Sequence, residues 1–190
     1  MPFFIQDLFV PEPVLYDGSQ LSPHWAYRTR GISGDSILSF RGPCRVSLEK
    51  MVDLADVLSR SVIYSPDMLH FIVEHFDTDL EKAVYRQRLL VCIIKEILEE
   101  RGVKVLRDGD DLYAGGKKLS VSIATVTPVS TMIHTGLNLT SEGVPVQAAG
   151  LLELGWQEEE VPAVARQICK KYVSELKSVY LARCKVRGVG

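Results

Sequence analysis

Two glycines and two lysines stand together past the middle of the chain, in the stretch Gly115-Gly116-Lys117-Lys118. Glycine lets a backbone approach a ligand closely, and an ammonium group pairs well with a carboxylate or phosphate. Side chains alternate along a strand, so Lys117 and Lys118 are expected on opposite faces. The pattern therefore places at most one of them in a binding site. The alternative is a hairpin tip with two solvated lysines.

A second cationic stretch is Arg41-Gly42-Pro43-Cys44-Arg45, where two guanidinium groups flank a predicted turn. Guanidinium groups can grip a carboxylate or phosphate through paired hydrogen bonds. Taken alone, however, the pattern favours a surface turn with unpaired arginines. The acidic run around Gly109 likewise favours a solvated turn, because it lacks the regular ligand spacing and distal glutamate of a calcium loop.

Histidines supply the other candidate groups. His134 begins the stretch His134-Thr135-Gly136 in an apolar strand, where it is either a site residue or a satisfied core group. His70 and His75 are five residues apart on a predicted strand, so they point to opposite faces and are unsuited to share a metal. We expect one to be packed and the other exposed. The four cysteines have neither the spacing nor the nearby histidines of a metal site.

Composition and charge make some classes of protein improbable. The chain has 190 residues, with 22 Lys and Arg against 24 Asp and Glu, for a net charge of −2. This balance argues against a dedicated nucleic-acid-binding protein. The longest apolar run, residues 89–94, is too short to cross a membrane, and the first ten residues do not resemble a signal peptide. We expect one cytoplasmic domain over residues 1–190, with an N-terminal arm at 1–21.

Periodicity and capping signals indicate an α+β fold with a mixed or antiparallel sheet packed against helices. Two long helices are predicted, at 79–101 and 157–184, and two short ones, at 24–30 and within 48–60. Turns are predicted at Arg41-Gly42-Pro43 and Ser65-Pro66-Asp67. The predicted strands are 3–10, 36–40, 61–64, 68–76, 103–105, 112–113, 118–127 and 131–139.

Three segments in order give the chain a family resemblance. The layout of Asp110-Asp111-Leu112-Tyr113, Gly116-Lys117-Lys118-Leu119-Ser120 and His134-Thr135-Gly136-Leu137-Asn138 resembles the catalytic domain of biotin and lipoate protein ligases. With Trp25-Ala26-Tyr27-Arg28 and Ser39-Phe40-Arg41-Gly42-Pro43, the whole sequence also looks like DUF366, a family of unknown function similar in fold to the ligases.

The resemblance implies roles for two residues, but one motif of the ligases, a glycine-rich loop, is missing from this sequence. Lys118 matches the invariant ligase lysine, which contacts the carboxyl and phosphate of an acyl-adenylate, and Asp111 matches the acidic residue of the preceding turn. The ligases' glycine-rich loop, of the form Arg-Arg-x-Ser-Gly-Gly-Gly, has no counterpart. Its expected place holds Val57-Leu58-Ser59-Arg60-Ser61, which contains no glycine.

These observations lead to three hypotheses. The first is an acyl or small-carboxylate transferase or ligase using Lys118, because a fixed cation can polarise a carbonyl or neutralise a phosphate. The second is a non-catalytic module that binds a carboxylate or nucleotide, and the third is a structural homo-oligomer, such as a homodimer. The cofactor is left open, with Mg-ATP implied only for a ligase. The expected ligand-binding residues are Arg41, Asp111, Gly115, Gly116, His134, Gly136 and Asn138.

Overall fold

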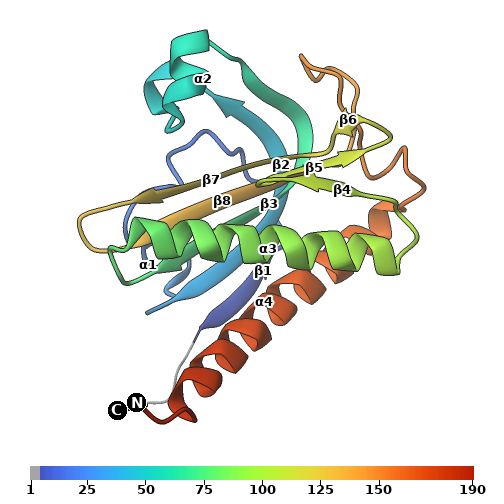
Figure 1. The fold of residues 1–190 in the computed structure, drawn as a ribbon. Helices are drawn as coiled ribbons and strands as arrows, with labels where there is room; N and C mark the ends of the chain where they lie inside the picture. Colours follow the sequence, from blue (N-terminus) through green and yellow to red (C-terminus); the bar gives the residue numbers. More distant parts are fainter. Residues whose placement is uncertain (1–4) are drawn as a thin grey trace.

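In the computed structural model, residues 5–190 are described, and their largest element is a five-stranded mixed sheet (Figure 1). The strand order is β1-β2-β3-β8-β7, with β1 parallel to β2 and the other pairs antiparallel. The bounds are β1 Gln6–Val10, β2 Ser36–Val46, β3 Ile63–His75, β7 Ser120–Val126 and β8 Thr131–Asn138. Phe3 and Phe4, in the first predicted strand, lie outside the described residues.

A second, three-stranded sheet consists of β4 Leu106–Asp108, β5 Asp111–Ala114 and β6 Lys117–Lys118. Its β5–β6 hairpin turns at Gly115 and Gly116, both with positive φ, as a tight turn requires. The hairpin expected between the predicted strands 112–113 and 118–127 is therefore present, but the second predicted strand is divided at Leu119 into β6 and β7, which belong to different sheets. The predicted strand at 103–105 is wrong, because β4 begins only at Leu106.

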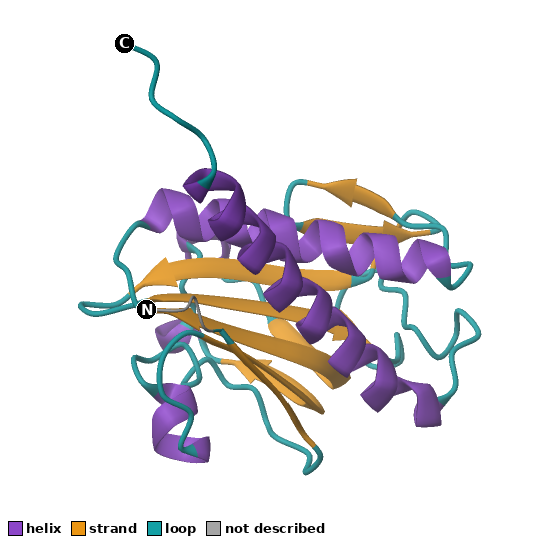
Figure 2. Cartoon of the chain, turned by 90° about the horizontal axis from the view of Figure 1, so that it is seen from below, coloured by secondary structure: helices purple, strands orange, loops and turns teal. Residues whose placement is uncertain are grey.

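Two long helices cover one face of the large sheet (Figure 2). The first, α3 Leu80–Glu100, packs on β7 and β8, while α4 Val161–Cys184 packs on β1 and β2. The Asp79 carboxylate caps α3 by accepting a hydrogen bond from the backbone N of Lys82 at 2.9 Å. The short helices are α1 Trp25–Arg30 and α2 Leu54–Ser59, with 3-10 turns at Leu48–Lys50 and Glu158–Glu160. The α+β prediction is confirmed.

Strand alternation divides the core between the two faces of the sheet. On β3, Leu69, Phe71 and Val73 face the long helices, whereas Met68 and Ile72 belong to a smaller apolar cluster on the opposite face. The opposite face is covered in part by the segment that precedes β2, through Val14, Tyr16 and Trp25. No helix within residues 5–190 has the length and apolar character needed to cross a membrane.

Strand β2 continues through Arg41-Gly42-Pro43, so the turn predicted there is wrong. Its pairing with β3 shifts register between Gly42 and Cys44, at a bulge. A Cβ at Gly42 would lie 2.1 Å from the backbone oxygen of Val14, so only glycine lets the preceding segment run this close. Three hydrogen bonds of 2.8–2.9 Å then hold residues 14–16 along the bulge.

The turn predicted at Ser65-Pro66-Asp67 is also wrong, because β3 runs unbroken from Ile63 to His75. Between the pairs Gly42–Met68 and Cys44–Ser65 the extra residue lies on β3, where Pro66 and Asp67 stand opposite Pro43 alone. A proline without an N–H is tolerated at such a position. The two misread turn signals are therefore two sides of one irregularity in the sheet.

Candidate functional site

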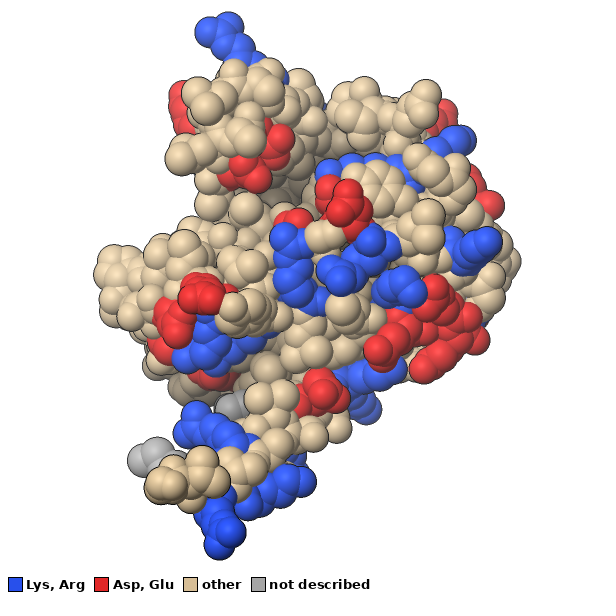
Figure 3. All heavy atoms as spheres, in the orientation of Figure 1, with Lys and Arg blue, Asp and Glu red and all other residues tan. Residues whose placement is uncertain are grey.

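A cavity of about 360 Å³ opens on the sheet face away from the long helices. In Figure 3 the molecule is hollowed between the α2 segment and the β5–β6 hairpin. Met68, Val121 and Ile123 supply an apolar floor from β3 and β7. Residues of the segment around α2 form one wall, and Lys118 with its neighbours forms another. The space suits a small molecule with an apolar body and a polar end.

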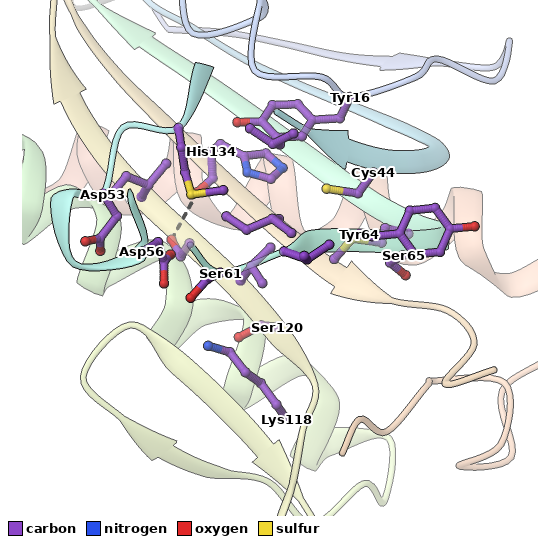
Figure 4. Close-up of a pocket in the computed structure, with 18 of the residues that line it drawn as sticks. Tyr16, Cys44, Asp53, Asp56, Ser61, Tyr64, Ser65, Lys118, Ser120 and His134 are labelled. Atoms are coloured by element: carbon purple, nitrogen blue, oxygen red, sulfur yellow. Dashed lines mark hydrogen bonds between the residues drawn. The ribbon is translucent and has the colours of Figure 1, made fainter. Parts of the chain in front are cut away.

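Lys118 and Asp111 form an ion pair at the cavity wall, with Nζ and Oδ2 2.9 Å apart. Both side chains are only partly exposed, at 34% and 26%. The Lys118 ammonium points into the cavity in Figure 4, while Lys117 is exposed and does not line it. An ammonium has three N–H donors, so the bond to Asp111 leaves two for a ligand.

His134 lines the cavity from β8 and is held by two aromatic neighbours. Its Nε2 lies 3.0 Å from Nδ1 of His70, and the Nε2 of His70 lies 3.1 Å from the backbone oxygen of Gly42. The ring of Tyr16 stacks on His134, with centroids 3.6 Å apart and planes 13° apart. Burial lowers the pKa of His70 to about 4 and that of His134 well below its ordinary value. Both imidazoles are neutral at pH 7.

The histidine expectation was half right. His70 and His75 do point to opposite faces. Both are buried, however, so the expectation that one of them would be exposed is wrong. His75 Nδ1 lies 2.8 Å from Asp35 Oδ2, and its Nε2 lies 2.9 Å from the Tyr172 hydroxyl on α4. Polar partners on each side satisfy both rings, which is how buried histidines are accommodated.

The other charges at the cavity are mostly acidic. Asp53 and Asp56 come from the α2 segment, and Asp110 is held by Gln87 at 2.8 Å and Arg88 at 3.3 Å. Lys50, the second lysine of the lining, is paired with Asp17 outside it. Both lining lysines therefore already carry a carboxylate partner.

A nucleotide triphosphate with Mg²⁺ fits these residues poorly. A triphosphate carries several negative charges and needs several cations or a cradle of backbone N–H groups, whereas the lining has two lysines against four carboxylates. Within residues 5–190, no group of three or more His, Cys, Asp or Glu side chains is arranged to hold a metal ion.

Cys44, a residue of β2 next to the bulge, also lines the cavity. Burial raises the pKa of its thiol to about 12, so the sulfur remains protonated at neutral pH. The reactive form of a cysteine is the thiolate. Cys44 in this environment is a small packing group and not an activated nucleophile.

Among the residues expected in the site, Lys118, Asp111, His134 and Asn138 all line the cavity. Asn138 donates from Nδ2 to the backbone oxygen of Lys118 at 3.4 Å, which ties the end of β8 to the lysine. These four come from three separate strands, and the fold brings them together.

The remaining expected residues lie elsewhere. The Arg41 guanidinium makes hydrogen bonds of 2.5–3.0 Å to Asp67 and one of 3.3 Å to Glu158, outside the cavity. Gly115 and Gly116 border a separate shallow hollow near the end of α3. Gly136 lies beneath the site, where a Cβ would meet Met68 Cε at 2.8 Å and the His134 ring at 3.4 Å. Its role is to leave room for those two side chains.

Sequence reasoning missed Tyr16, Cys44 and His70 as neighbours of the site. Tyr16 lies in the segment between β1 and α1, and its place depends on hydrogen bonds with Pro43 and Arg45, far along the chain. The one usable signal was Gly42, whose lack of a side chain marks a close backbone approach.

Comparison with known proteins adds three kinds of finding. Residues 5–187 match the family described as "Domain of unknown function (DUF366)". An uncharacterized protein of Methanocaldococcus jannaschii, MJ0805, is 41% identical over 182 residues, covering 93% of this chain and 81% of its own length. A protein of unknown function from Pyrococcus horikoshi has a structure with a TM-score of 0.93 at 42% identity, covering 98% of this chain and all of that one.

Two more distant structures share the fold. The biotin protein ligase of Aquifex aeolicus, in complex with biotin and ATP, matches with a TM-score of 0.59 at 16% identity, covering 90% of this chain and 72% of its own. Ta0514 of T. acidophilum, a candidate lipoate protein ligase with bound lipoic acid, matches with a TM-score of 0.59 at 15% identity, covering 89% and 86%. At these identities the likeness establishes the fold alone, and it confirms the expected ligase-like architecture.

Proposed function

This chain belongs to the DUF366 family, and we propose that its cavity binds a small carboxylate or acyl compound for acyl transfer, with Lys118 at the ligand's anionic or carbonyl end. The observation that carries the proposal is the Lys118 ammonium at the wall of a cavity with an apolar floor. A fixed cation in a partly dry site stabilises a carboxylate and polarises a carbonyl oxygen. Asp111 acts as a positioning residue that holds the ammonium in place.

The shape of the lining supports the same class of ligand. Met68, Val121 and Ile123 offer apolar surface for a hydrocarbon body, while the polar groups lie at the edges. The biotin and lipoate ligase structures that share this fold were determined with biotin and with lipoic acid, which are small carboxylic acids. That likeness supports a carboxylate ligand without naming which one.

A second candidate is a binding module without catalysis. It is favoured by the segment around α2, which contains no glycine between Val52 and Val62 and lines the cavity with Asp53 and Asp56. Such a wall lacks the backbone cradle on which phosphate chemistry depends. Any transfer catalysed here would then need an acyl group that is already activated.

A ligand screen tests the proposal. Straight-chain, branched and ring-containing carboxylates are added to the full chain, with and without Mg-ATP, and the melting temperature is recorded. Binding at 100 times Kd stabilises the folded state by about 2.7 kcal/mol, which such a measurement resolves. We expect stabilisation by one class of carboxylate, independent of Mg-ATP. If no carboxylate shifts the melting temperature, the proposal is wrong.

Turnover separates the two candidates. An acyl thioester of the best carboxylate is incubated with the protein, and loss of the thioester to water or to an added amine, with release of the thiol, is followed against a protein-free control. Accelerated loss that depends on Lys118 supports transfer. Binding without any acceleration supports the non-catalytic module.

A further inference from the structure

The two buried histidines beside the cavity fix each other's protons. The backbone oxygen of Gly42 can only accept a hydrogen bond, so the Nε2 of His70, 3.1 Å away, carries the proton. A neutral His70 then has an unprotonated Nδ1, which accepts from Nε2–H of His134 at 3.0 Å. Consequently the Nδ1 of His134 is the unprotonated nitrogen of its ring, a hydrogen-bond acceptor.

This acceptor has no partner within the described part of the chain. The only side-chain hydrogen bond of His134 there is the one to His70, and His134 belongs to the lining of the cavity. Within residues 5–190, Ser36 Oγ is the only fully buried side-chain N or O atom without a partner, so the unpaired Nδ1 of His134 is accessible from the cavity. Nδ1 is therefore free to receive a bond from a bound molecule.

The surroundings hold the ring in one orientation. Tyr16 stacks on His134 at 3.6 Å, and Phe40 stacks on His70 with centroids 5.0 Å apart. Gly136 leaves the space that the edge of the His134 ring needs. With both rings packed and the proton positions set by Gly42, the acceptor cannot become a donor by simple rotation or tautomer exchange. Such preorganisation is typical of a specificity-determining group.

We propose that His134 Nδ1 accepts a hydrogen bond from the ligand, so that the compound bound here is a carboxylate or acyl compound that also carries an N–H or O–H group at its far end. The inference rests on the proposed function, which supplies the carboxylate end at Lys118. His70 acts as a positioning residue that fixes the proton on His134.

The strand register sets the length of the compound. Asn138 adjoins Lys118, and His134 lies four residues back along β8, roughly 13 Å at the ordinary rise of a strand. The Lys118 side chain reaches toward the interior and shortens the span (Figure 4). An extended molecule is needed to touch both groups, with its apolar middle over Val121 and Ile123.

Matched pairs of acids test the proposal by calorimetry. The probes are straight-chain carboxylates of six, eight and ten carbons, each compared with the same acid bearing a terminal hydroxyl group. We expect the hydroxy acid of one chain length to bind about 2- to 10-fold more tightly than its unsubstituted partner. The preference should disappear in His134→Phe, which keeps the stacked ring, and persist in His134→Asn, whose amide oxygen can take the place of Nδ1.

The outcomes separate this inference from the function on which it rests. If the acids bind through Lys118 but the hydroxyl group brings no gain, or the gain survives in His134→Phe, the inference is wrong and the proposed function stands. If neither kind of acid binds, both are overturned.

A ligand-free measurement keeps the proposal falsifiable even if the variants fail to fold. Nitrogen-15 NMR of histidine-labelled protein at pH 7 should show both His70 and His134 protonated on Nε2. In His70→Phe, the His134 signals should report a mixture of tautomers, a change that loss of packing alone would not produce. Protonation of His134 on Nδ1 in the wild-type protein would overturn the proposal.

Discussion

At the scale of single residues, the two neighbouring lysines, Lys117 and Lys118, lie in different environments. Lys118 lines the cavity and bonds Asp111, whereas Lys117 is exposed on the other face of a two-residue strand. The alternation of side chains along β6 produces the difference, and the pairing of Lys118 with Tyr113 sets the register. The sequence alone predicts that the two lysine side chains point to opposite faces of the strand. Which of them faces the cavity depends on the register of β6 against β5.

Lys118→Ala should weaken binding of whichever carboxylate the screen identifies. A hydrogen bond to a charged group contributes about 1.5–3 kcal/mol, so we expect a loss of roughly 10- to 150-fold in affinity. Lys117→Ala is the matched control and should leave the affinity nearly unchanged. Calorimetry of both variants provides the measurement. Equal losses, or a larger loss from Lys117→Ala, would show that Lys118 does not anchor the ligand.

At the scale of elements, local sequence signals correctly predicted the long helix α3 but gave wrong turns at the bulge between β2 and β3. The Asp79 cap and the helical apolar spacing give α3 nearly its observed bounds, because both signals act within the helix itself. Gly42-Pro43 and Ser65-Pro66 carry equally strong local turn signals, yet both lie inside strands. Pairing between β2 and β3, with the segment around Val14 filling the bulge, overrides them. No pattern within one segment reports such a partner.

The inner face of α3 provides a test at this scale. Ile94 is fully buried in the core between α3 and the sheet, so Ile94→Ala should lower the free energy of unfolding by about 2–5 kcal/mol through lost transfer energy and a cavity. Tyr85→Ala, at a position 64% exposed on the same helix, should cost much less. Chemical denaturation measures both. A cost below about 0.5 kcal/mol for Ile94→Ala would contradict the packing.

The segment around α2 provides a second test of the elements. It lines the cavity with Asp53 and Asp56 and contains no glycine-rich loop, so we expect weak or absent exchange of pyrophosphate into ATP with biotin or lipoate. A biotin protein ligase assayed in parallel shows that the assay works. Robust exchange with either acid would mean that another segment of the chain cradles the phosphates.

At the scale of the whole molecule, the site joins parts of the chain that are far apart in sequence. Tyr16, His70 and His134 come from the N-terminal segment, β3 and β8, and their rings meet only because the sheet places these strands side by side. Sequence pattern identified His134 as a candidate but could not supply its partner, which is 64 residues away. The family resemblance predicted the fold and pointed to Lys118, whereas the pairing of His70 with His134 is seen only in the structure.

Burial of this pair ties the stability of the whole fold to pH. In the unfolded chain a histidine has its ordinary pKa of 6.5, whereas in the folded chain burial lowers the pKa of His70 to about 4 and that of His134 well below 6.5. Between these values the unfolded chain binds protons that the folded chain excludes. The stabilisation is therefore complete above about pH 6.5 and is lost progressively as the pH falls toward 4.

We therefore expect the free energy of unfolding to fall with pH below 6.5, with a slope that approaches about 1.4 kcal/mol per pH unit for each buried histidine. Urea denaturation at a series of pH values measures the slope. His134→Phe, which removes one of these titrating groups and keeps the stacked ring, should make the slope shallower by up to that amount. Leu58→Ala, at a position that is 85% exposed and carries no titrating group, is the control and should keep the wild-type slope. An unchanged slope in His134→Phe would show that His134 is already charged in the folded protein, or that the ring is open to water.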